Sequence, residues 1–404
     1  MKVLRNIVDK IKPTFSKGGK LGFLHSTFDA FETFLFVPNT TTKHGAHVRD
    51  CNDIKRTMIT VVVALIPCLL FGCYNTGIQV GLQGWTAFLY GLFSILPMIA
   101  VSYIVGLGIE FTVAQWRGHE VNEGFLVSGL LIPLVMPVST PLWMVALGTA
   151  FAVIFGKEIF GGTGMNVFNP AVLARAFVFF AYTPQMSGEK VWYSNWEWFG
   201  VNAADVATGA TALDKAATKG AVALEQVVNN GGIIENNDFV LNSFLGFIPG
   251  SFGETSTLAI LLGAAILLFT GVASWKTIIS VFVGGLAMAY TFDIFGGGAL
   301  SNPVVDGVAV EGIEPYMHLL IGGFAFGAVF MATDPVTSAQ TSTGKYIVGF
   351  LTGALAILIR EINPAYPEGM MLSILFMNAL APLVDYFVVE ANIRRRKNRV
   401  KTVK

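Results

Sequence analysis

Long apolar runs separated by short polar segments fill most of the chain beyond residue 56. A helix needs about 20 apolar residues to cross the hydrocarbon layer of a membrane. Ten runs come close enough to that length to predict membrane-spanning helices. They cover residues 57–74, 88–113, 124–137, 141–157, 167–183, 255–273, 276–295, 315–332, 346–360 and 370–389. The third run is short and bounded by proline, so we expect an all-α polytopic membrane protein that includes short broken helices.

Composition supports the membrane assignment. Hydrophobic residues make up 53% of the 404 residues and charged residues only 13%, and the mean hydropathy is +0.63. A soluble domain carries about 25% charged residues, so this chain cannot cover a water-exposed surface with ions. Basic and acidic residues number 26 each, and the balance gives no indication of nucleic-acid binding. No apolar run precedes residue 56, so we expect no cleavable signal peptide.

The distribution of charge predicts the topology, because Lys and Arg accumulate on the cytoplasmic side of a membrane. Residues 1–56 hold ten bases against five acids, and residues 391–404 hold seven bases and no acid. Both termini are therefore expected in the cytoplasm. Residues 184–254 hold three bases against eight acids, which places this long loop outside. Four bases fall on inner turns in this scheme, namely Arg117, Lys157, Lys276 and Lys345; Arg360, beside Glu361 near the outer face, is the exception.

Two acidic outer loops, 184–254 and 296–314, divide the predicted spans into two sets of five. The run from Gly124 to Ser139 is similar to the run from Gly323 to Ser338, and the two cross in opposite directions. Inverted repeats of this kind place broken helices and a ligand site at their interface, although two Gly- and Pro-containing apolar runs also match by chance. The expected organisation is a cytoplasmic amphipathic arm (1–56), a first five-helix half (57–183), an outer loop (184–254), a second five-helix half (255–390) and a basic cytoplasmic tail (391–404).

The most specific local pattern lies in the outer loop, at Asp205-Val-Ala-Thr208-Gly209-Ala210-Thr211. Read from the residues alone, it is a flexible turn, because Asp, Thr and Gly are common in loops. The pattern also resembles the site at which a periplasmic flavin transferase joins FMN, through its phosphate, to the last hydroxyl residue. Only the small size of Gly209 and Ala210, which permits close approach, follows from the residues themselves.

Four further blocks extend this resemblance over essentially the whole chain: Lys157–Gly164, Asn169–Ala171, Met331–Pro335 and Asn363–Met371. Together they resemble the B subunits of Na⁺-translocating NADH:quinone reductases. The resemblance implies a multi-pass protein of the bacterial inner membrane that carries covalent FMN as a phosphoester on Thr211. Asp205, Thr208, Gly209 and Ala210 would complete the flavinylation motif.

A glycine-rich inner turn from Gly161 to Pro170 opens the fifth predicted span. Unpaired amides at a helix N-terminus favour a polar or anionic ligand, and Asn166 and Asn169 add side-chain donors and acceptors. The alternative is a tight turn in which Asn169 is the N-cap and Pro170 is the first helical residue. The family resemblance implies a non-covalent riboflavin here, with Asn166, Asn169 and Asp334 at the matching positions.

Acids at membrane depth are costly and usually functional, and Glu110, Asp293 and Asp385 qualify. The alternative is that each lies near a span end and reaches water, which we prefer for Asp293. The resemblance implies that Glu110 and Asp385 serve quinone access or sodium passage. Quinone needs an apolar slot with few polar anchors. The candidates for that slot are Gly106, Glu110, Phe177 and Phe179.

The chain lacks the residues to oxidise NADH alone. Its cysteines, Cys51, Cys68 and Cys73, contain no CxxC pair, and no dinucleotide-binding fingerprint is present. The resemblance therefore implies partners: an NADH-oxidising flavin and iron–sulfur subunit, a second FMN-bearing subunit and iron–sulfur membrane subunits. Electrons would pass from the Thr211 FMN through riboflavin to quinone, coupled to Na⁺ export. Two alternatives stay open, an RNF-type electron-transport subunit and a channel or carrier for sodium or a small polar solute.

Overall fold

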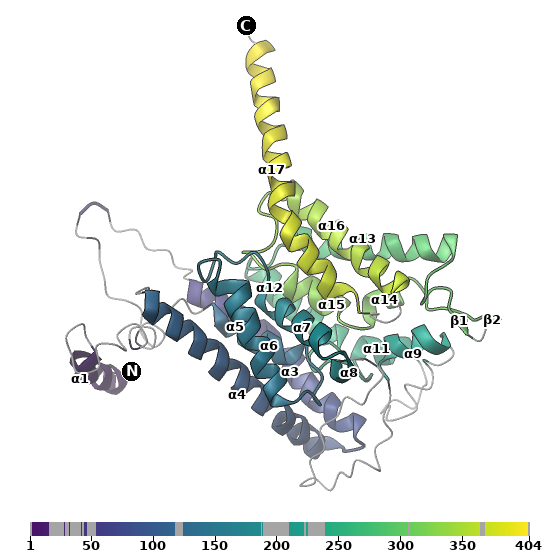
Figure 1. Cartoon of the computed structure of the whole chain (residues 1–404), viewed down its shortest axis with the longest axis horizontal. Helices are drawn as coiled ribbons and strands as arrows, with labels where there is room; N and C mark the ends of the chain where they lie inside the picture. The colour runs from purple at the N-terminus through teal and green to yellow at the C-terminus, as the bar shows by residue number, and fades with distance from the viewer. Residues whose placement is uncertain are drawn as a thin grey trace.

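The computed structural model describes residues 2–15, 54–117, 124–186, 210–221, 239–305, 308–363 and 368–402, with residues 28, 32, 42, 44–46, 188 and 224. Helices make up nearly all regular structure in these ranges, and the apolar ones pack into one body (Figure 1). A two-residue hairpin, β1 (Val304–Val305) with β2 (Val308–Ala309), departs from this pattern. The prediction of an all-α polytopic membrane protein is otherwise confirmed.

The first half of the membrane body consists of two long helices followed by shorter ones. They are α3 (Ile54–Gln79), α4 (Gly84–Arg117), α5 (Phe125–Leu134), α6 (Leu142–Val153), the π-helical segment η2 (Ile154–Glu158) that continues α6, and α7 (Pro170–Ala181). Helices α3 and α4 form a close hairpin. A Cβ on Gly77 would overlap the backbone of Ala87, and one on Gly91 would overlap the backbone of Cys73, so small residues allow this approach.

The second half repeats the order of a helix pair, a broken helix and two further helices. It comprises α12 (Thr257–Phe269), α13 (Trp275–Phe295), α14 (Met317–Leu320), α15 (Phe324–Phe326), the π-helical segment η4 (Gly327–Met331), α16 (Ser342–Ile362) and α17 (Met370–Thr402). Among the described residues, four further short helices lie outside the two halves: α1 (Lys2–Phe15), α8 (Thr183–Met186), α9 (Ala212–Lys219) and α11 (Phe239–Leu245).

Every predicted span overlaps a helix, but the helices differ in length. Five in the described part of the chain are long and apolar enough to cross a membrane, namely α3, α4, α13, α16 and α17. The apolar helices α5, α7 and α12 have 10, 12 and 13 residues. A 13-residue helix is only about 20 Å long, shorter than the hydrocarbon core of about 30 Å. The short broken helices are therefore confirmed, whereas the count of ten crossings and the inverted repeat stay predictions.

The broken helix α5 ends against a segment from elsewhere in the chain. The amide of Gly253 donates to the carbonyl of Leu134 at 2.7 Å, and the amide of Phe252 lies 3.5 Å from the carbonyl of Met136. Backbone polar groups at membrane depth must find partners inside the protein. The segment leading into α12 therefore supplies the amide donors that the next turn of a longer α5 would have supplied.

Helices α13 and α16 make the closest helix pair of the second half. A Cβ on Gly284 would overlap the carbonyl of Phe350, and one on Gly353 would overlap the carbonyl of Val281. Gly349 lies four residues before Gly353 and faces Ser280 in the same way. This small-xxx-small spacing lets the two backbones pack in direct contact, which is a common basis of helix association in membranes.

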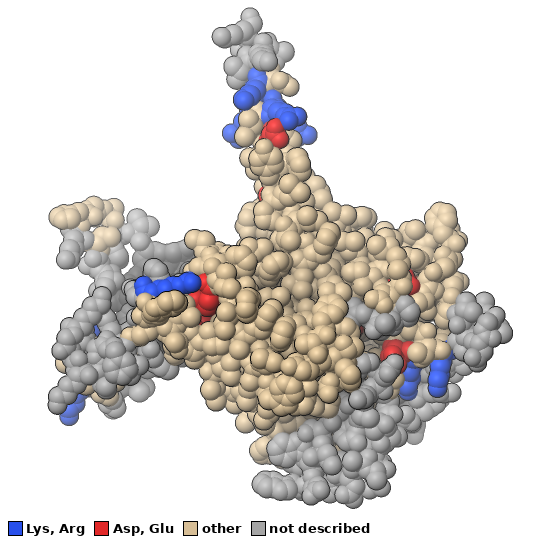
Figure 2. Space-filling model, in the orientation of Figure 1, with Lys and Arg blue, Asp and Glu red and all other residues tan. Residues whose placement is uncertain are grey.

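Charge is sparse on the face drawn in Figure 2, and the basic residues gather on the part of α17 that projects from the body. The bases predicted on the cytoplasmic side also lie near one another in the structure. Lys276 donates to Ser342 at 2.9 Å, and it lines one cavity with Lys345. That cavity shares Val272, Ala273, Thr333 and Pro335 with a second cavity lined by Lys157. Three of the four bases predicted on inner turns thus lie on one side of the protein.

We expect Gly353→Leu to separate α13 from α16, because the new side chain would overlap the Val281 carbonyl. Overpacking of this kind costs about 1–3 kcal/mol or more. Thermal unfolding in detergent and the monodispersity of the purified chain measure the effect. Gly108→Leu is the matched control, because a Cβ there meets no atom within 4 Å. Equal stability of both variants would contradict close packing at Gly353.

Candidate functional site

Two cavities lie near the two ends of α7. The Asn169 cavity surrounds Asn169, the residue immediately before α7. The Thr211 cavity is lined by Thr211. The amide of Thr211 donates to the carbonyl of Gly188 at 2.8 Å, and Gly188 follows α7 and α8 in the sequence. The twelve residues of α7 span about 18 Å. The segments predicted to lie on the inner side and on the outer side of the membrane therefore each contribute to one cavity.

A glycine-rich turn forms one wall of the Asn169 cavity. Gly161, Gly162 and Gly164 have φ values of +120°, +97° and +89°, a region in which side chains with a Cβ are strained. The turn brings Thr163 against Gly124, where a Cβ would lie 2.4–3.3 Å from the Thr163 side chain and could not be accommodated without a shift. The turn thus holds Thr163 and Asn166 on the cavity wall.

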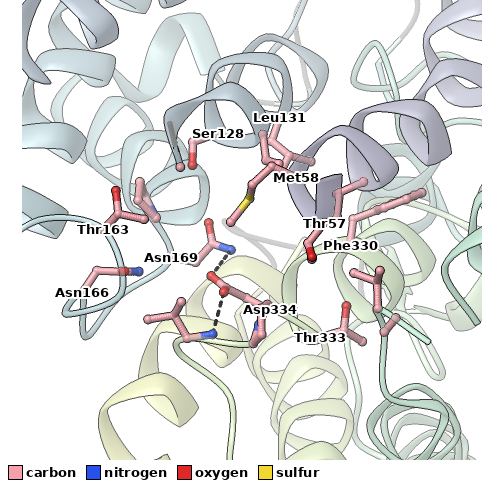
Figure 3. A pocket seen from close by; sticks show the side chains of 18 of the residues that line it. Thr57, Met58, Ser128, Leu131, Thr163, Asn166, Asn169, Phe330, Thr333 and Asp334 are labelled. Carbon is pink, nitrogen blue, oxygen red and sulfur yellow. Dashed lines mark hydrogen bonds between the residues drawn. The ribbon is translucent and has the colours of Figure 1, made fainter. Parts of the chain in front are cut away.

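Asn169 joins this wall to the second half of the protein. Its Oδ1 accepts from the amide of Ala171 at 3.0 Å, which makes it the N-cap of α7. Its Nδ2 donates to Asp334 Oδ2 at 3.1 Å, and Asp334 Oδ1 accepts from the amide of Val336 at 3.0 Å (Figure 3). The capping interpretation is therefore confirmed. The Asn169 side chain also contacts Asp334, so two of the predicted site residues meet. The third, Asn166, donates from its Nδ2 to the carbonyl of Phe168 at 3.1 Å.

Much of the rest of the Asn169 cavity is apolar, although hydroxyl side chains also line it. Its space, open mouth included, is about 790 Å³. Val61, Leu131, Leu267 and Phe330 are among the apolar residues that line it, and Figure 3 shows Met58 and Leu131 facing Asn169 across the space. Such a pocket suits a flat, mostly apolar ligand with polar groups along one edge.

The charges at this cavity favour a ligand without a phosphate. Lys157 is the one base among its described lining residues, and its ammonium is ion-paired with Glu110 in a buried contact. Asp334 faces the cavity, and burial raises the pKa of its carboxyl although hydrogen bonds from Val336 and Thr337 oppose that rise. An anionic ligand would therefore meet a carboxyl and no free cation on this described wall.

Thr211 begins helix α9 and lies half-buried at the Thr211 cavity. It is the N-cap, and its hydroxyl accepts from the amide of Asp214 at 3.4 Å. Amides at a helix N-terminus favour a negative group such as a phosphate. Ala210 precedes it and is also half-buried. The other predicted motif residues, Asp205, Thr208 and Gly209, lie outside the described residues.

Beneath Thr211 the structure places charged residues that sequence reasoning missed. Arg175 is fully buried in α7, and its Nη2 donates to both carboxylate oxygens of Glu368 at 2.7 and 2.6 Å. Its Nη1 donates to Ser251 at 3.2 Å. Glu254, Glu368 and Ser251 line the cavity with Thr211. An arginine within a predicted span was the available signal, because intramembrane charge is a functional indicator.

The predicted quinone residues do not line either cavity. A Cβ on Gly106 would overlap the ring of Phe125, so the protein's own aromatic ring fills the space expected for a ligand. Phe177 stacks on Phe151 of α6 with centroids 4.1 Å apart. Phe179 is 8% exposed and packs edge-on against Phe180. The quinone assignment of Gly106, Glu110, Phe177 and Phe179 stays a prediction.

The other acids predicted at membrane depth, Asp385 and Asp293, differ in their surroundings. Asp385 accepts from the amides of Gln340 and Thr341 at 2.6 and 3.1 Å and from the Thr341 hydroxyl at 2.5 Å, and so anchors the start of α16 to α17. Asp293 is exposed near the end of α13, as the water-facing interpretation expects. Arg360, placed near the outer face from sequence, is fully buried and donates to the carbonyl of His318 at 2.7 Å.

Known proteins share sequence similarity with this chain over most of its length. Residues 41–394 match the NQR2, RnfD, RnfE family. The B subunit of the Na(+)-translocating NADH-quinone reductase of Chromohalobacter salexigens is 46% identical, over 98% of this chain and 96% of its own length. The proteins of the same name from Stutzerimonas stutzeri and Azotobacter vinelandii are 44% and 43% identical, over 97% and 98% of this chain and 98% of their own lengths. The chain is therefore a polytopic membrane protein that belongs to the NQR2, RnfD, RnfE family.

Proposed function

We propose that the chain is the B subunit of a sodium-translocating NADH:quinone reductase and passes electrons across the membrane between two flavin sites. The observation that carries the proposal is the position of the Asn169 and Thr211 cavities near opposite ends of α7. The names of relatives that share nearly the full length support the same activity. A flavin at each site would supply reversible electron transfer, which no side chain provides.

The Asn169 cavity is the proposed riboflavin site. Asn166, Asn169 and Asp334 offer amide and carboxyl groups along one edge, and Leu131, Val61 and Phe330 offer apolar walls. Lys157 is already paired with Glu110, so the wall favours an uncharged flavin over one with a phosphate.

Thr211 is the proposed attachment residue for FMN. Its hydroxyl lies at the N-terminus of α9 and lines a cavity, so a phosphoester on it would meet the positive end of the helix. The charge-derived topology puts Thr211 outside, where an exported flavin transferase could reach it. Asp205, Thr208, Gly209 and Ala210 complete the motif in sequence.

The complete reaction requires other subunits. We propose that NADH oxidation and the iron–sulfur relay belong to partner subunits in the bacterial inner membrane, and that both termini of this chain are cytoplasmic. Quinone reduction and sodium export complete the cycle. Export against the membrane potential needs about 2.3 kcal/mol per charge per 100 mV, which the redox steps must provide. Glu110 and Asp385 remain the predicted sodium residues on this chain.

Two other functions can be separated by simple measurements. An RNF-type subunit would carry the same flavin motif but assemble with different partners, so co-purification distinguishes it. A passive channel or carrier for a polar solute would carry no flavin. Fluorescence of the chain in a denaturing gel distinguishes a flavoprotein from such a channel.

Thr211→Ala is expected to remove the covalent flavin completely, because the hydroxyl that forms the ester is absent. The measurement is FMN retained by the chain after acid precipitation. Thr211→Ser should retain it, because serine keeps the hydroxyl. Thr218→Ala is the control on the same helix, since that exposed hydroxyl bonds to local backbone carbonyls. Flavin retained on the alanine variant would refute Thr211 as the attachment site.

Asn169→Ser is expected to lower bound riboflavin while sparing covalent FMN. Serine keeps an oxygen that caps α7 but loses the amide that donates to Asp334. We expect roughly a tenfold or greater loss of riboflavin affinity, about 1.4 kcal/mol or more, because that amide no longer holds the Asp334 carboxyl on the cavity wall. The ratio of extracted riboflavin to covalent FMN measures it. A wild-type ratio would remove Asn169 from the site.

A further inference from the structure

Two carboxyl groups line the floor of the Thr211 cavity, that of the buried Glu254 and that of the half-buried Glu368, and the buried Arg175 pairs with Glu368. Arg175 occupies both oxygens of Glu368 and leaves Glu254 without an ionic partner of its own among the described residues. Glu254 is 4% exposed, lines the cavity, and its Oε1 accepts no hydrogen bond from the described part of the chain. A buried carboxylate without a partner is costly. One positive charge is therefore missing at Glu254.

The surrounding charged residues do not supply that charge. On α16, Arg360 and Glu361 are adjacent and both buried. Glu361 is held by Ser301 Oγ at 2.6 Å, the amide of Leu300 at 2.8 Å and His318 Nε2 at 3.0 Å. Arg360 donates to backbone carbonyls, including that of Glu368 at 3.4 Å. This second layer is balanced within itself, which leaves the excess negative charge at Glu254.

We propose that Glu254 is the anionic ligand of a small monovalent cation bound at the floor of the Thr211 cavity, and that the cation is sodium. The choice of sodium rests on the proposed function. Ser251 and Thr255 line the cavity with Glu254 and carry hydroxyl oxygens, which are hard ligands. Each of these oxygens also accepts one hydrogen bond, from Arg175 and Asn75 respectively. Nothing in the sequence marked this residue, since Glu254 lies at the end of the predicted outer loop rather than within a span.

The backbone around Glu254 leaves room for its carboxyl. A Cβ on Gly323 would lie 2.7 Å from Glu254 Oε1, and so glycine is required there. Gly322, with φ of +70°, also lines the cavity. The break between α14 and α15 thus accommodates the acid at the point where the second half faces Thr211.

Burial and the nearby Glu368 raise the pKa of the Glu254 carboxyl, although Arg175 and Ser251 oppose that rise. The ionised form of Glu254 is therefore disfavoured in its present surroundings, and a cation beside it would stabilise that form.

A cation at Glu254 would also be linked to the group on Thr211, since both lie in one cavity. Negative charge added at Thr211 would strengthen cation binding at Glu254, and by reciprocity bound sodium would favour that added charge. The site is thus a place where ion occupancy and electron occupancy influence each other.

Thermal unfolding of the detergent-purified assembly tests the site. A cation that binds only the folded state raises the unfolding temperature. We expect NaCl, but not choline chloride at equal ionic strength, to raise it in the wild type.

Glu254→Gln should lose the sodium-dependent rise, because the neutral amide cannot replace the carboxylate as a cation ligand. Glu314→Gln is the control, because Glu314 is an exposed acid of the described outer segment. Thr255→Val, which removes one hydroxyl without changing charge, should raise the half-saturating sodium concentration. This second variant tests the site even when Glu254→Gln folds poorly. A full sodium response in Glu254→Gln, or none in the wild type, would overturn the proposal.

The flavin assignment is scored separately in the same samples by in-gel fluorescence. A sodium response that depends on Glu254 in a chain without covalent flavin would support the cation site and reject the proposed flavin function. Covalent flavin without that response would do the reverse.

Discussion

The ion pair between Arg175 and Glu368 holds the structure together at its centre. Arg175 belongs to α7 in the first half, and Glu368 precedes α17 in the second, 193 residues later. A guanidinium and a carboxylate taken out of water need each other, because removing one partner leaves a buried charge that costs several kcal/mol. The pair therefore fixes α7 between the halves. Both candidate cavities depend on that position, since Asn169 begins the same helix and reaches Asp334 across the same interface.

The two cavities differ in electrostatic character. At the Asn169 cavity the one described lining base, Lys157, is neutralised by Glu110, and the remaining polar groups are amides, hydroxyls and a single carboxyl with a raised pKa. At the Thr211 cavity charged groups are buried directly beneath the surface. Neutral redox groups suit the first setting. Groups whose charge changes are better placed at the Thr211 cavity, where charged residues of the protein lie close enough to interact with them.

Periodicity and charge predicted much of the fold. All ten apolar runs became helices, and Lys157, Lys276 and Lys345 lie on one side, as the charge rule expected. Helix ends were less predictable, because an end such as that of α5 lies where a distant segment, through the amide of Gly253, donates to the carbonyl of Leu134. Of the candidate site, the Asn169 and Asp334 contact was foreseen, whereas Glu254 and Glu368 were not. Those acids lie in loops, and only the folded chain shows that Glu254 is buried and that Glu368 pairs with Arg175.

The seam at the end of α5 restricts how the protein can move. Gly253 donates to the carbonyl of Leu134, and a Cβ on Gly253 would meet the Leu134 side chain at 3.0 Å. Sliding one half past the other here would expose unpaired amides to hydrocarbon, where no water replaces the lost bond. We therefore expect this region to stay fixed, so that relative motion of the two halves is carried by helices farther from the seam.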